Sequence, residues 1–300
     1  MLSAAALTAE LETHRKALRF HCYQLLGTVS DAEDFVQETY LRAFDAAADF
    51  EARSSVKTWL FRIATYACID EVRRRKRRRL VSTTRPNGSE AELGTELELD
   101  GWIEPFPDAL LPDRRVARIE AVTLAFVAAV QWLPPRQRAI LVLRDSLDWS
   151  AHDVALLLGM TPGAVHAALL RARATLATKL GEPRASGRED LATARAFASA
   201  FARGDVTAIA KMLREDVEIH MPPYKLWLRG APAVLDFLPR RIWAGRRLTV
   251  RLTHANGRLA TVALDRGKPF AVMVFERIQR RRVATIHAFV MPHLVARFAA

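Results

Sequence analysis

The chain has 300 residues, half of them hydrophobic, and a formal net charge of +12 at pH 7. Its length predicts roughly two to three domains that each bury a core, which excludes a disordered, charged tail. No stretch approaches the ~18 uninterrupted apolar residues of a membrane span, and Glu10 and Glu12 precede any signal-like apolar segment. We therefore expect a cytoplasmic protein without membrane insertion.

The only cysteines, Cys22 and Cys68, both fall in apolar helical patterns. This placement predicts two buried thiols in a reducing compartment. A metal site that combines Cys22 with His14 or His21 lacks the paired CxxC spacing of such sites, so we expect neither a metal nor a cofactor.

Charge divides the chain into segments. Residues 1–80 carry a net +3, residues 81–113 carry −7, residues 114–182 carry +4 and residues 183–300 carry +12. The acidic segment 81–113 contains four prolines and few apolar clusters, which is typical of a linker with little structure of its own. A second, shorter linker is predicted at residues 182–189.

Within residues 1–80, the stretch SDAEDFVQETYLRAFDAAADF has helical periodicity. Ser30, with Glu33 three residues later, is the expected capping box. The inward face consists of Ala32, Phe35, Val36, Thr39, Ala43 and Ala46. The outward face carries Asp34, Gln37, Glu38, Leu41 and Asp45. Such an acidic face is either a solvated helix surface or a contact for a partner.

A second helix is expected from Ser54 or Ser55, with an inward face of Val56, Leu60, Ile63 and Ala67. It continues into seven consecutive cations, Arg73 to Arg79, which would repel one another unless a polyanion lay along them. A nuclear localisation signal and an anionic membrane surface also suit such a run. The apolar face stops at Val72, which favours nucleic acid, with phosphate contacts that give affinity rather than sequence choice.

Residues 114–181 predict a second helical domain. Pro134 and Pro135 end one helix and begin the next. Ser150 with Asp153 forms a capping box for a short helix that ends at Gly159.

The last helix of this domain begins at Thr161, an N-cap followed by Pro162 at the first helical position. Its exposed face is expected to carry His166, Arg171 and Arg173. A short helix, a turn with glycine and a longer basic helix indicate a helix-turn-helix that binds DNA. An ordinary three-helix bundle is the alternative.

The two helical segments and the acidic linker resemble one family, the sigma factors of bacterial RNA polymerase, in their small extracytoplasmic-function group. The similarity covers about residues 10–180. It implies that DAEDFVQETYLRAF contacts the clamp helices of the polymerase β′ subunit through Asp34, Gln37 and Glu38. It also implies that LPPRQRAILVLRDSLDWSAHDVALLLGMTPGAVHAALLRARATL reads the minus-thirty-five promoter element.

By the same resemblance, SSVKTWLFRIATYACIDEVRRRKRRR binds the melted strand of the minus-ten element and the duplex upstream of it. The implied DNA contacts are Ser54, Ser55, Lys57, Arg62, Arg73, Arg74, Arg75, Arg77 and Arg78, with Thr161, His166, Arg171 and Arg173 in the second segment. Trp59 either stacks on a base or belongs to the core. The chain departs from the family where His166 and Ala168 stand in place of common Lys and Arg.

Residues 190–300 form a separate predicted domain. A helix that ends at Gly204 and a second short helix come first, and Asn256-Gly257 marks a hairpin among the strands that follow. This order, and MPPYKLWLRG in particular, resembles the SnoaL-like domain of the ketosteroid-isomerase superfamily. The expected fold is multidomain, with two all-α helical domains and a C-terminal α+β cone that has a curved antiparallel sheet.

That superfamily includes enzymes with an acid or a base in a pocket. Asp216 is a titratable candidate, and the candidate pocket residues are His220, Trp227, His254, Phe275 and His287. No acid and base occur as a pair at fixed spacing, so we expect a binding or docking module and not an enzyme.

The expected function is that of a sigma factor, which binds core RNA polymerase, reads a bipartite promoter and helps melt it. The C-terminal domain is expected to modulate this activity. A DNA-binding protein that acts without polymerase and carries a small-ligand sensor or enzyme domain is the alternative. The linker and the C-terminal domain carry opposite charges, which favours intramolecular docking between them. Contact of the basic surface of the C-terminal domain with DNA upstream of the promoter is the alternative. A small ligand and a separate anti-sigma protein both stay open as partners.

Overall fold

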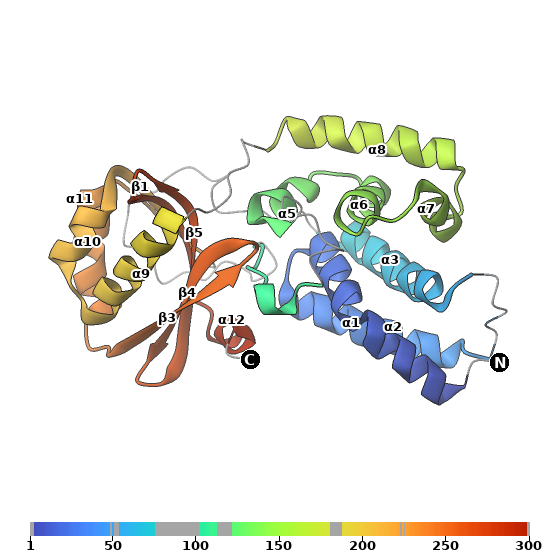
Figure 1. Cartoon of the computed structure of the whole chain (residues 1–300), viewed down its shortest axis with the longest axis horizontal. Coiled ribbons are helices and arrows are strands. Elements are labelled where there is room, and N and C mark those ends of the chain that lie inside the picture. The colour runs from blue at the N-terminus through green and yellow to red at the C-terminus, as the bar shows by residue number, and fades with distance from the viewer. Residues whose placement is uncertain are drawn as a thin grey trace. The chain divides into compact units, whose positions relative to one another are not determined.

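The computed structural model describes residues 3–48, 50, 54–75, 102–112, 122–180, 188–222, 224 and 226–298. It divides into two compact units (Figure 1). The first, here called the helical unit, comprises Met1–Arg79, Ile103–Phe106 and Leu110–Pro183. The second, the sheet unit, comprises Leu80–Trp102, Pro107–Ala109 and Arg184–Ala300. The two predicted helical domains therefore lie in one unit.

Three helices form the first part of the helical unit: α1 (Ala4–Leu26), α2 (Val29–Asp45) and α3 (Val56–Arg74). Each is capped by a hydroxyl that accepts a hydrogen bond from a first-turn backbone N–H, on Ser3, Thr28 and Ser55 respectively. The predicted cap Ser30 is wrong. Gly27, at φ 91°, ends α1 in the left-handed region, and the extended Thr28 then begins α2.

The predicted inward face of α2 is buried or half-buried along its length. In α3, Leu60 and Ala67 are buried as predicted, but Val56 and Ile63 are only half-buried. The buried face of α3 is wider than predicted because α3 contacts α1 and α2 on one side and helices of the second group on the other. Cys22 and Cys68 are buried free thiols.

The second group of helices is α5 (Leu124–Val130), α6 (Pro135–Leu141), a π-helical turn η5 (Val142–Ser146), α7 (Ala151–Leu158) and α8 (Pro162–Ala177). The predicted caps at Ser150 and Thr161 and the left-handed Gly159 are all confirmed. In the described part of the chain no single helix is long and apolar enough to cross a membrane. Only α7 and α8 together reach that length and composition, across a bend of 101°.

Buried polar contacts join the two groups of helices at the C-terminal end of α1. Arg138 Nη1 donates to the backbone oxygen of Leu25 at 2.6 Å and to Gln131 Oε1 at 2.7 Å. Gln131 Nε2 donates to the backbone oxygen of Gln24 at 3.3 Å, and Gln24 Nε2 donates to Ser146 Oγ at 3.0 Å. The last carbonyls of a helix have no partner within it, so α6 and the end of α5 supply partners for those of α1.

The expectation of little structure in the acidic linker is wrong for residues 102–112. Tyr23 Oη donates to the backbone oxygen of Glu104 at 2.8 Å, and the Glu104 carboxylate accepts from Val29 N at 2.8 Å. Phe106 is fully buried, with its ring centroid 4.6 Å from that of Tyr23. Residues 108–110 form the short helix η4 (Asp108–Leu110). The contacts of Glu104 and Phe106 thus hold this part of the acidic linker on the helical unit.

The sheet unit begins with α9 (Arg188–Arg203) and α10 (Val206–Met212). Its strands are β1 (Leu213–Met221), β2 (Leu226–Arg229), β3 (Leu248–Ala255), β4 (Arg258–Asp265), β5 (Lys268–Gln279) and β6 (Arg282–Phe289). Between β2 and β3 lie α11 (Ala231–Phe237) and the π-helical segment η6 (Leu238–Trp243). The chain closes with α12 (Pro292–Val295) and η7 (Ala296–Phe298).

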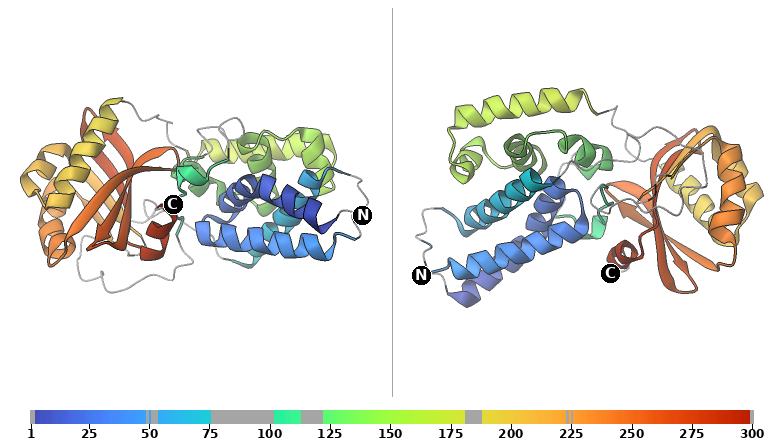
Figure 2. Two further views of the ribbon diagram at one scale, coloured as in Figure 1. Left: turned by 60° about the horizontal axis from the view of Figure 1, so that its bottom comes forward. Right: turned by 180° about the vertical axis from the view of Figure 1, so that it is seen from behind.

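The six strands form one sheet in the order β2-β1-β6-β5-β4-β3. The predicted antiparallel sheet is correct except for β1 and β6, which run parallel, so the sheet is mixed. The predicted hairpin at Asn256-Gly257 joins β3 to β4, with both residues at positive φ. Helices α9, α10 and α11 lie on one face of the sheet and α12 on the other (Figure 2). This arrangement is the expected α+β cone.

Candidate nucleic-acid and partner interfaces

Helix α2 presents the predicted acidic face to solvent. Asp34 and Gln37 are exposed, and Glu38 accepts a hydrogen bond from Arg42 Nε at 2.8 Å. On the same helix Leu41 and Phe44 are exposed by 62% and 41%. Large apolar side chains beside carboxylates are more typical of a protein contact than of a solvated surface. The charge pattern alone did not single out Phe44.

The start of α3 gathers three of the predicted DNA contacts. Ser55 Oγ accepts from Thr58 N at 3.1 Å and lies 2.9 Å from Thr58 Oγ1, while Ser54 precedes it in the loop. Lys57 is exposed, with its Nζ 4.9 Å from the ring centroid of Trp149. Arg62 is exposed further along α3. Hydroxyls and cations at one helix start can contact a phosphate or an unstacked base.

Trp59, which was predicted either to stack on a base or to pack in the core, is half-buried. Its ring centroid lies 4.9 Å from that of Phe50. One side of the indole is therefore used in packing within the helical unit.

The described part of the arginine run is paired with acids. Arg73 Nη1 lies 3.0 Å from Asp70 Oδ1, and Arg74 Nη2 lies 2.7 Å from Glu71 Oε1. Arg75 lies 2.9 Å from Asp31 Oδ2 at the start of α2 and also pairs with Glu71. The prediction that only a polyanion would relieve the repulsion is wrong for these three arginines. The predicted contacts Arg77 and Arg78 lie outside the described residues.

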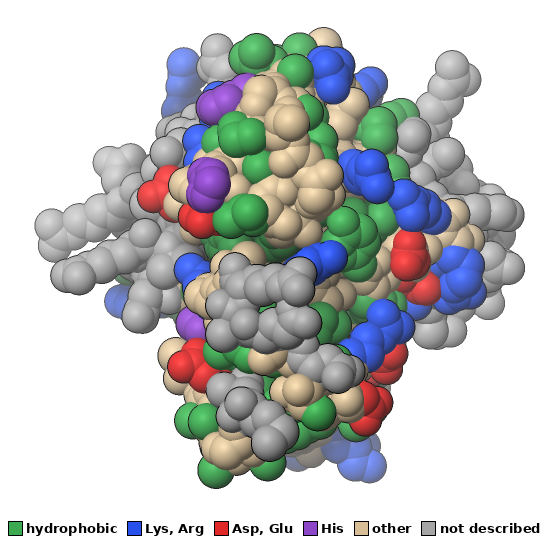
Figure 3. All heavy atoms as spheres, turned by 90° about the vertical axis from the view of Figure 1, so that its right-hand side faces the viewer, with side chains coloured by type: hydrophobic (Ala, Val, Ile, Leu, Met, Phe, Trp, Pro, Cys, Tyr) green, Lys and Arg blue, Asp and Glu red, His purple; other side chains and the backbone are tan. Residues whose placement is uncertain are grey.

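Helices α7 and α8 meet at an angle of 101°, within the range of helix-turn-helix motifs. Thr161 Oγ1 accepts from Ala164 N at 3.2 Å and keeps its own hydroxyl hydrogen for another acceptor. His166 and Arg171 are exposed, as predicted. Figure 3 shows hydrophobic side chains that reach the surface on this side of the helical unit. On α8, Leu170 is exposed by 67%.

Arg173, the third residue predicted on the exposed face of α8, is exposed and also has an acidic partner within the helical unit. Arg173 makes a bidentate pair with Asp145, at 3.0 Å from Nε and 2.6 Å from Nη2, and this hydrogen bonding raises its pKa. Its guanidinium is therefore fixed against η5. Ala168 is buried, so the expectation that a DNA-contacting cation is missing at this position is wrong.

The candidate pocket residues of the sheet unit do not meet in one pocket. His220, His287 and Trp227 pack together, with the His220 ring centroid 4.9 Å from each of the other two. Burial lowers the pKa of His220 to about 3 and that of His287 to about 4, so both are neutral at pH 7. His254 is exposed on β3, and Phe275 packs on Phe197 at 5.4 Å.

Asp216, the other titratable candidate, is exposed and pairs with Arg214 at 2.7 Å. Hydrogen bonding to Arg214 lowers the pKa of this carboxyl. It is a surface ion pair and not a pocket acid.

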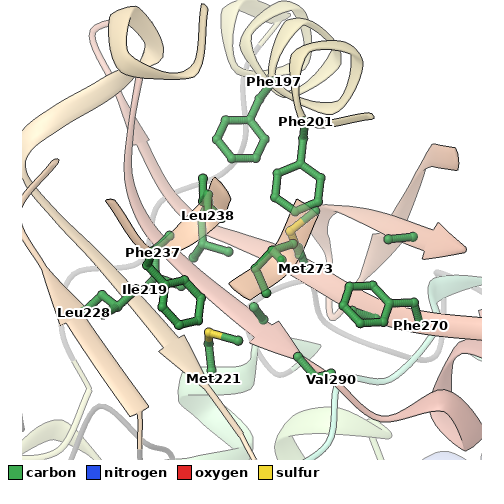
Figure 4. A pocket seen from close by; sticks show the side chains of 15 residues that line it. Phe197, Phe201, Ile219, Met221, Leu228, Phe237, Leu238, Phe270, Met273 and Val290 are labelled. Atoms are coloured by element: carbon green, nitrogen blue, oxygen red, sulfur yellow. The ribbon is translucent and has the colours of Figure 1, made fainter. Parts of the chain in front are cut away.

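A small cavity of about 30 Å³ lies between the helices and the sheet. Figure 4 shows Phe197 and Phe201 of α9 facing Met273, with Leu238, Phe237 and Met221 around the same space. All fifteen lining side chains are apolar, and none of the five predicted pocket residues is among them. The two histidines of β1 and β6 alternate with lining residues of the same strands, so they lie on the opposite face.

Comparisons with known proteins match three separate segments of the chain. Residues 11–78 match the family Sigma-70 region 2, residues 123–176 match Sigma-70, region 4, and residues 194–291 match the SnoaL-like domain. The ECF RNA polymerase sigma factor SigG of Mycobacterium tuberculosis (strain H37Rv) is 36% identical over 97% of this chain and 83% of its own length. SigW of Bacillus subtilis (strain 168), also an ECF RNA polymerase sigma factor, is 28% identical over 53% of this chain and 80% of its own.

A solved structure shares the fold of the whole chain. The Mycobacterium tuberculosis extracytoplasmic function sigma factor SigJ superposes with a TM-score of 0.62 at 21% identity, covering 97% of this chain and 98% of SigJ.

The helix-turn-helix and the helix with an exposed acidic and apolar face define a multidomain transcription protein with an appended α+β cone. The chain belongs to the extracytoplasmic-function sigma factors of RNA polymerase, and it carries a C-terminal SnoaL-like domain. Members of this family are not enzymes, and their partners are core RNA polymerase and promoter DNA. The family predicted from the sequence is confirmed.

Proposed function

We propose that this sigma factor directs polymerase to a bipartite promoter, helps to melt it, and is modulated by its C-terminal domain. One observation supports this proposal: the chain has two separate exposed elements whose polar and basic side chains can contact DNA. One is the start of α3, with Ser55 and Lys57, and the other is α8, with His166 and Arg171.

The acidic face of α2 is proposed to contact a basic surface of the polymerase through Asp34, Gln37 and Glu38. Leu41 and Phe44 add apolar area that the contact would bury, at roughly 25 cal/mol per Å². The carboxylates would steer the approach and the apolar side chains would supply affinity.

Promoter melting is assigned to the start of α3. Ser54, Ser55, Lys57 and Arg62 would hold a base drawn out of the stack, which costs a few kcal/mol. Phosphate contacts at the other end of α3 would offset part of that cost. Arg73 suits this role because its pair with Asp70 is exposed at the surface, where such pairs are worth roughly 0–1 kcal/mol and can exchange partners. Arg74 is exposed as well, although its partner Glu71 is nearly buried.

In α8 the reading of the second promoter element is assigned to Thr161, His166 and Arg171. Arg173 is proposed to hold α8 in place through Asp145 and to contribute to DNA binding only through its remaining exposed charge. Arg171→Ala should therefore change promoter preference, whereas Arg173→Ala should mainly loosen the fold.

For the C-terminal domain we propose binding and not catalysis. Its cavity has no titratable side chain among the lining residues that the structure describes, and acid–base chemistry needs one. Any small ligand there would be apolar and would need side chains to move, since ~30 Å³ is far below the size of ordinary ligand pockets.

We further propose that electrostatic docking between the C-terminal domain and the acidic linker modulates the sigma factor. Five arginines of the sheet unit were expected to face solvent. Arg247, Arg280, Arg281 and Arg282 are exposed, whereas Arg246 is half-buried. Their proposed partners Glu90, Glu92, Glu96 and Glu98 lie outside the described residues. Small-angle scattering at low and high salt, on wild type and on the variant with these four Glu changed to Gln, tests this. A compact form that responds to neither salt nor the four changes rules it out.

Run-off transcription with purified core polymerase, with and without residues 188–300, tests the proposed function. We expect promoter-dependent transcripts from the full chain and an altered yield from the shortened one. Sequence-specific DNA binding without any polymerase-dependent transcript would favour the alternative, a DNA-binding protein that acts without polymerase.

A further inference from the structure

A hollow of about 450 Å³ lies in the helical unit where its two groups of helices meet. One wall comes from the ends of α1 and α3 and consists of Leu26, Val72, Arg73 and Arg75. The other comes from α6 and the connection that precedes it and consists of Gln131, Trp132, Leu133, Pro134, Pro135 and Arg138. The volume is within the range of ligand pockets, about 300–1,000 Å³.

The charged groups of this lining are all cationic. Three of its described residues are arginines, and none is Asp or Glu. Arg138 is buried and its Nη atoms donate to carbonyl and amide oxygens, whereas Arg75 pairs with Asp31 and Glu71. Arg73 is 55% exposed, so its pair with Asp70 can yield to a stronger anion. The hollow is therefore suited to a negatively charged group.

One wall of the hollow is flat and aromatic. Trp132 is 36% exposed, so part of its indole ring reaches the surface of the hollow. Lys179 Nζ lies 4.5 Å from its ring centroid, which adds a further cation close to this wall. Leu133, Pro134 and Pro135 continue the apolar surface. An exposed indole next to guanidinium groups offers stacking and phosphate binding in one place.

We propose that this hollow binds a flat, anionic metabolite that carries a phosphate group, as a nucleotide does. Arg73 binds the phosphate, and Trp132 stacks on the ring. Because its walls belong to both groups of helices, the bound molecule joins them and stabilises the helical unit by mass action. If the proposed promoter contacts are correct, the ligand also competes with DNA for Arg73; this last consequence alone rests on the proposed function.

The test is calorimetric titration of the full chain, without DNA or polymerase, using ATP, adenosine and inorganic pyrophosphate at physiological ionic strength. We expect ATP to bind at least about tenfold more tightly than either of its parts, because stacking and phosphate contacts add. Failure of this binding would leave the transcription result untouched, so the two proposals fail separately.

Variants assign the binding to the hollow. Trp132→Leu is expected to weaken ATP about tenfold and to leave pyrophosphate unchanged, and Trp132→Phe should restore most of the loss. Arg73→Gln should weaken both ligands. Arg15→Gln is the matched control, since Arg15 is also about half exposed and also pairs at 3.0 Å with an acid three residues away, Glu12.

Three results would overturn the proposal. One is the absence of ATP binding at millimolar concentration. Another is equal affinity for ATP and pyrophosphate together with indifference to Trp132, which means general attraction of anions to a basic protein. The third is an equal loss on Arg15→Gln and Arg73→Gln.

Discussion

Replacement of Arg138 by methionine tests whether its buried guanidinium holds the two groups of helices together. Methionine replaces the aliphatic stem of arginine but ends about where Nε lies, and it donates no hydrogen bond. The change removes donors at 2.6 Å from the backbone oxygen of Leu25, at 2.7 Å from Gln131 Oε1 and at 2.9 Å from Gln131 O. These acceptors then stay buried without their charged partner.

The magnitude follows from those contacts. A hydrogen bond to a charged group contributes about 1.5–3 kcal/mol, so three of them amount to at least ~4.5 kcal/mol. The wild-type protein carries the desolvation cost of the buried guanidinium charge, and the variant does not, which offsets part of that loss. We therefore expect the free energy of unfolding of the helical unit to fall by about 3 kcal/mol. For a unit of this size the melting temperature would fall by roughly 6–12 °C.

The assay is urea unfolding followed by far-ultraviolet circular dichroism, with hydrogen exchange of the end of α1 as a local readout. Arg136→Met is the matched control, because Arg136 lies on the same helix, α6, and is exposed. It should change stability by no more than about 0.5 kcal/mol. Equal unfolding midpoints for the two variants, with unchanged exchange at Leu25, would refute the reasoning.

Other predictions concern the interfaces and the histidines. Asp34→Ala with Glu38→Ala should weaken binding to core polymerase while circular dichroism stays unchanged, because neither side chain is buried; unaltered affinity contradicts the α2 assignment. Arg173→Ala should destabilise the helical unit by about 1 kcal/mol in thermal unfolding, and a larger effect on promoter choice than on stability would oppose its structural role. His220 and His287 have folded pKa values of about 3 and about 4, below the ordinary histidine value of ~6.5. The stability that these two neutral rings contribute is therefore complete above pH ~6.5 and is lost as the pH falls toward ~4. His220→Phe should therefore flatten the acid side of the stability profile of the sheet unit, by up to a few kcal/mol at pH ~4.5, and an identical profile would argue against buried neutral rings.

Local signals in the sequence were enough to predict several helix caps and one hairpin turn. Ser55, Ser150 and Thr161 cap helices as expected, and Asn256-Gly257 forms the expected hairpin. Each of these contacts joins residues within about four positions, so the sequence contains both partners. The wrong cap at Ser30 shows the limit of this reasoning. Gly27 ends α1 in the left-handed region, so the next residue, Thr28, is extended and caps α2.

The candidate sites were predicted in part. Exposure of Asp34, Gln37, His166 and Arg171 followed from helical periodicity, since a period of 3.6 assigns a face to every residue. The partner of Arg173 did not follow, because Arg173 meets Asp145 across a gap of 28 residues.

By itself the sequence determined the helix-turn-helix of α7 and α8, the exposed faces of α2 and α8, and the family of the protein. Each of these depends on periodicity, caps and motifs within short windows. Only the tertiary structure decided that β1 pairs in parallel with β6, that His220 and His287 turn away from the apolar cavity, and that Arg138 reaches the end of α1. These features depend on contacts between distant segments, and a strand pattern does not reveal which of its two faces will meet the helices until the sheet is assembled.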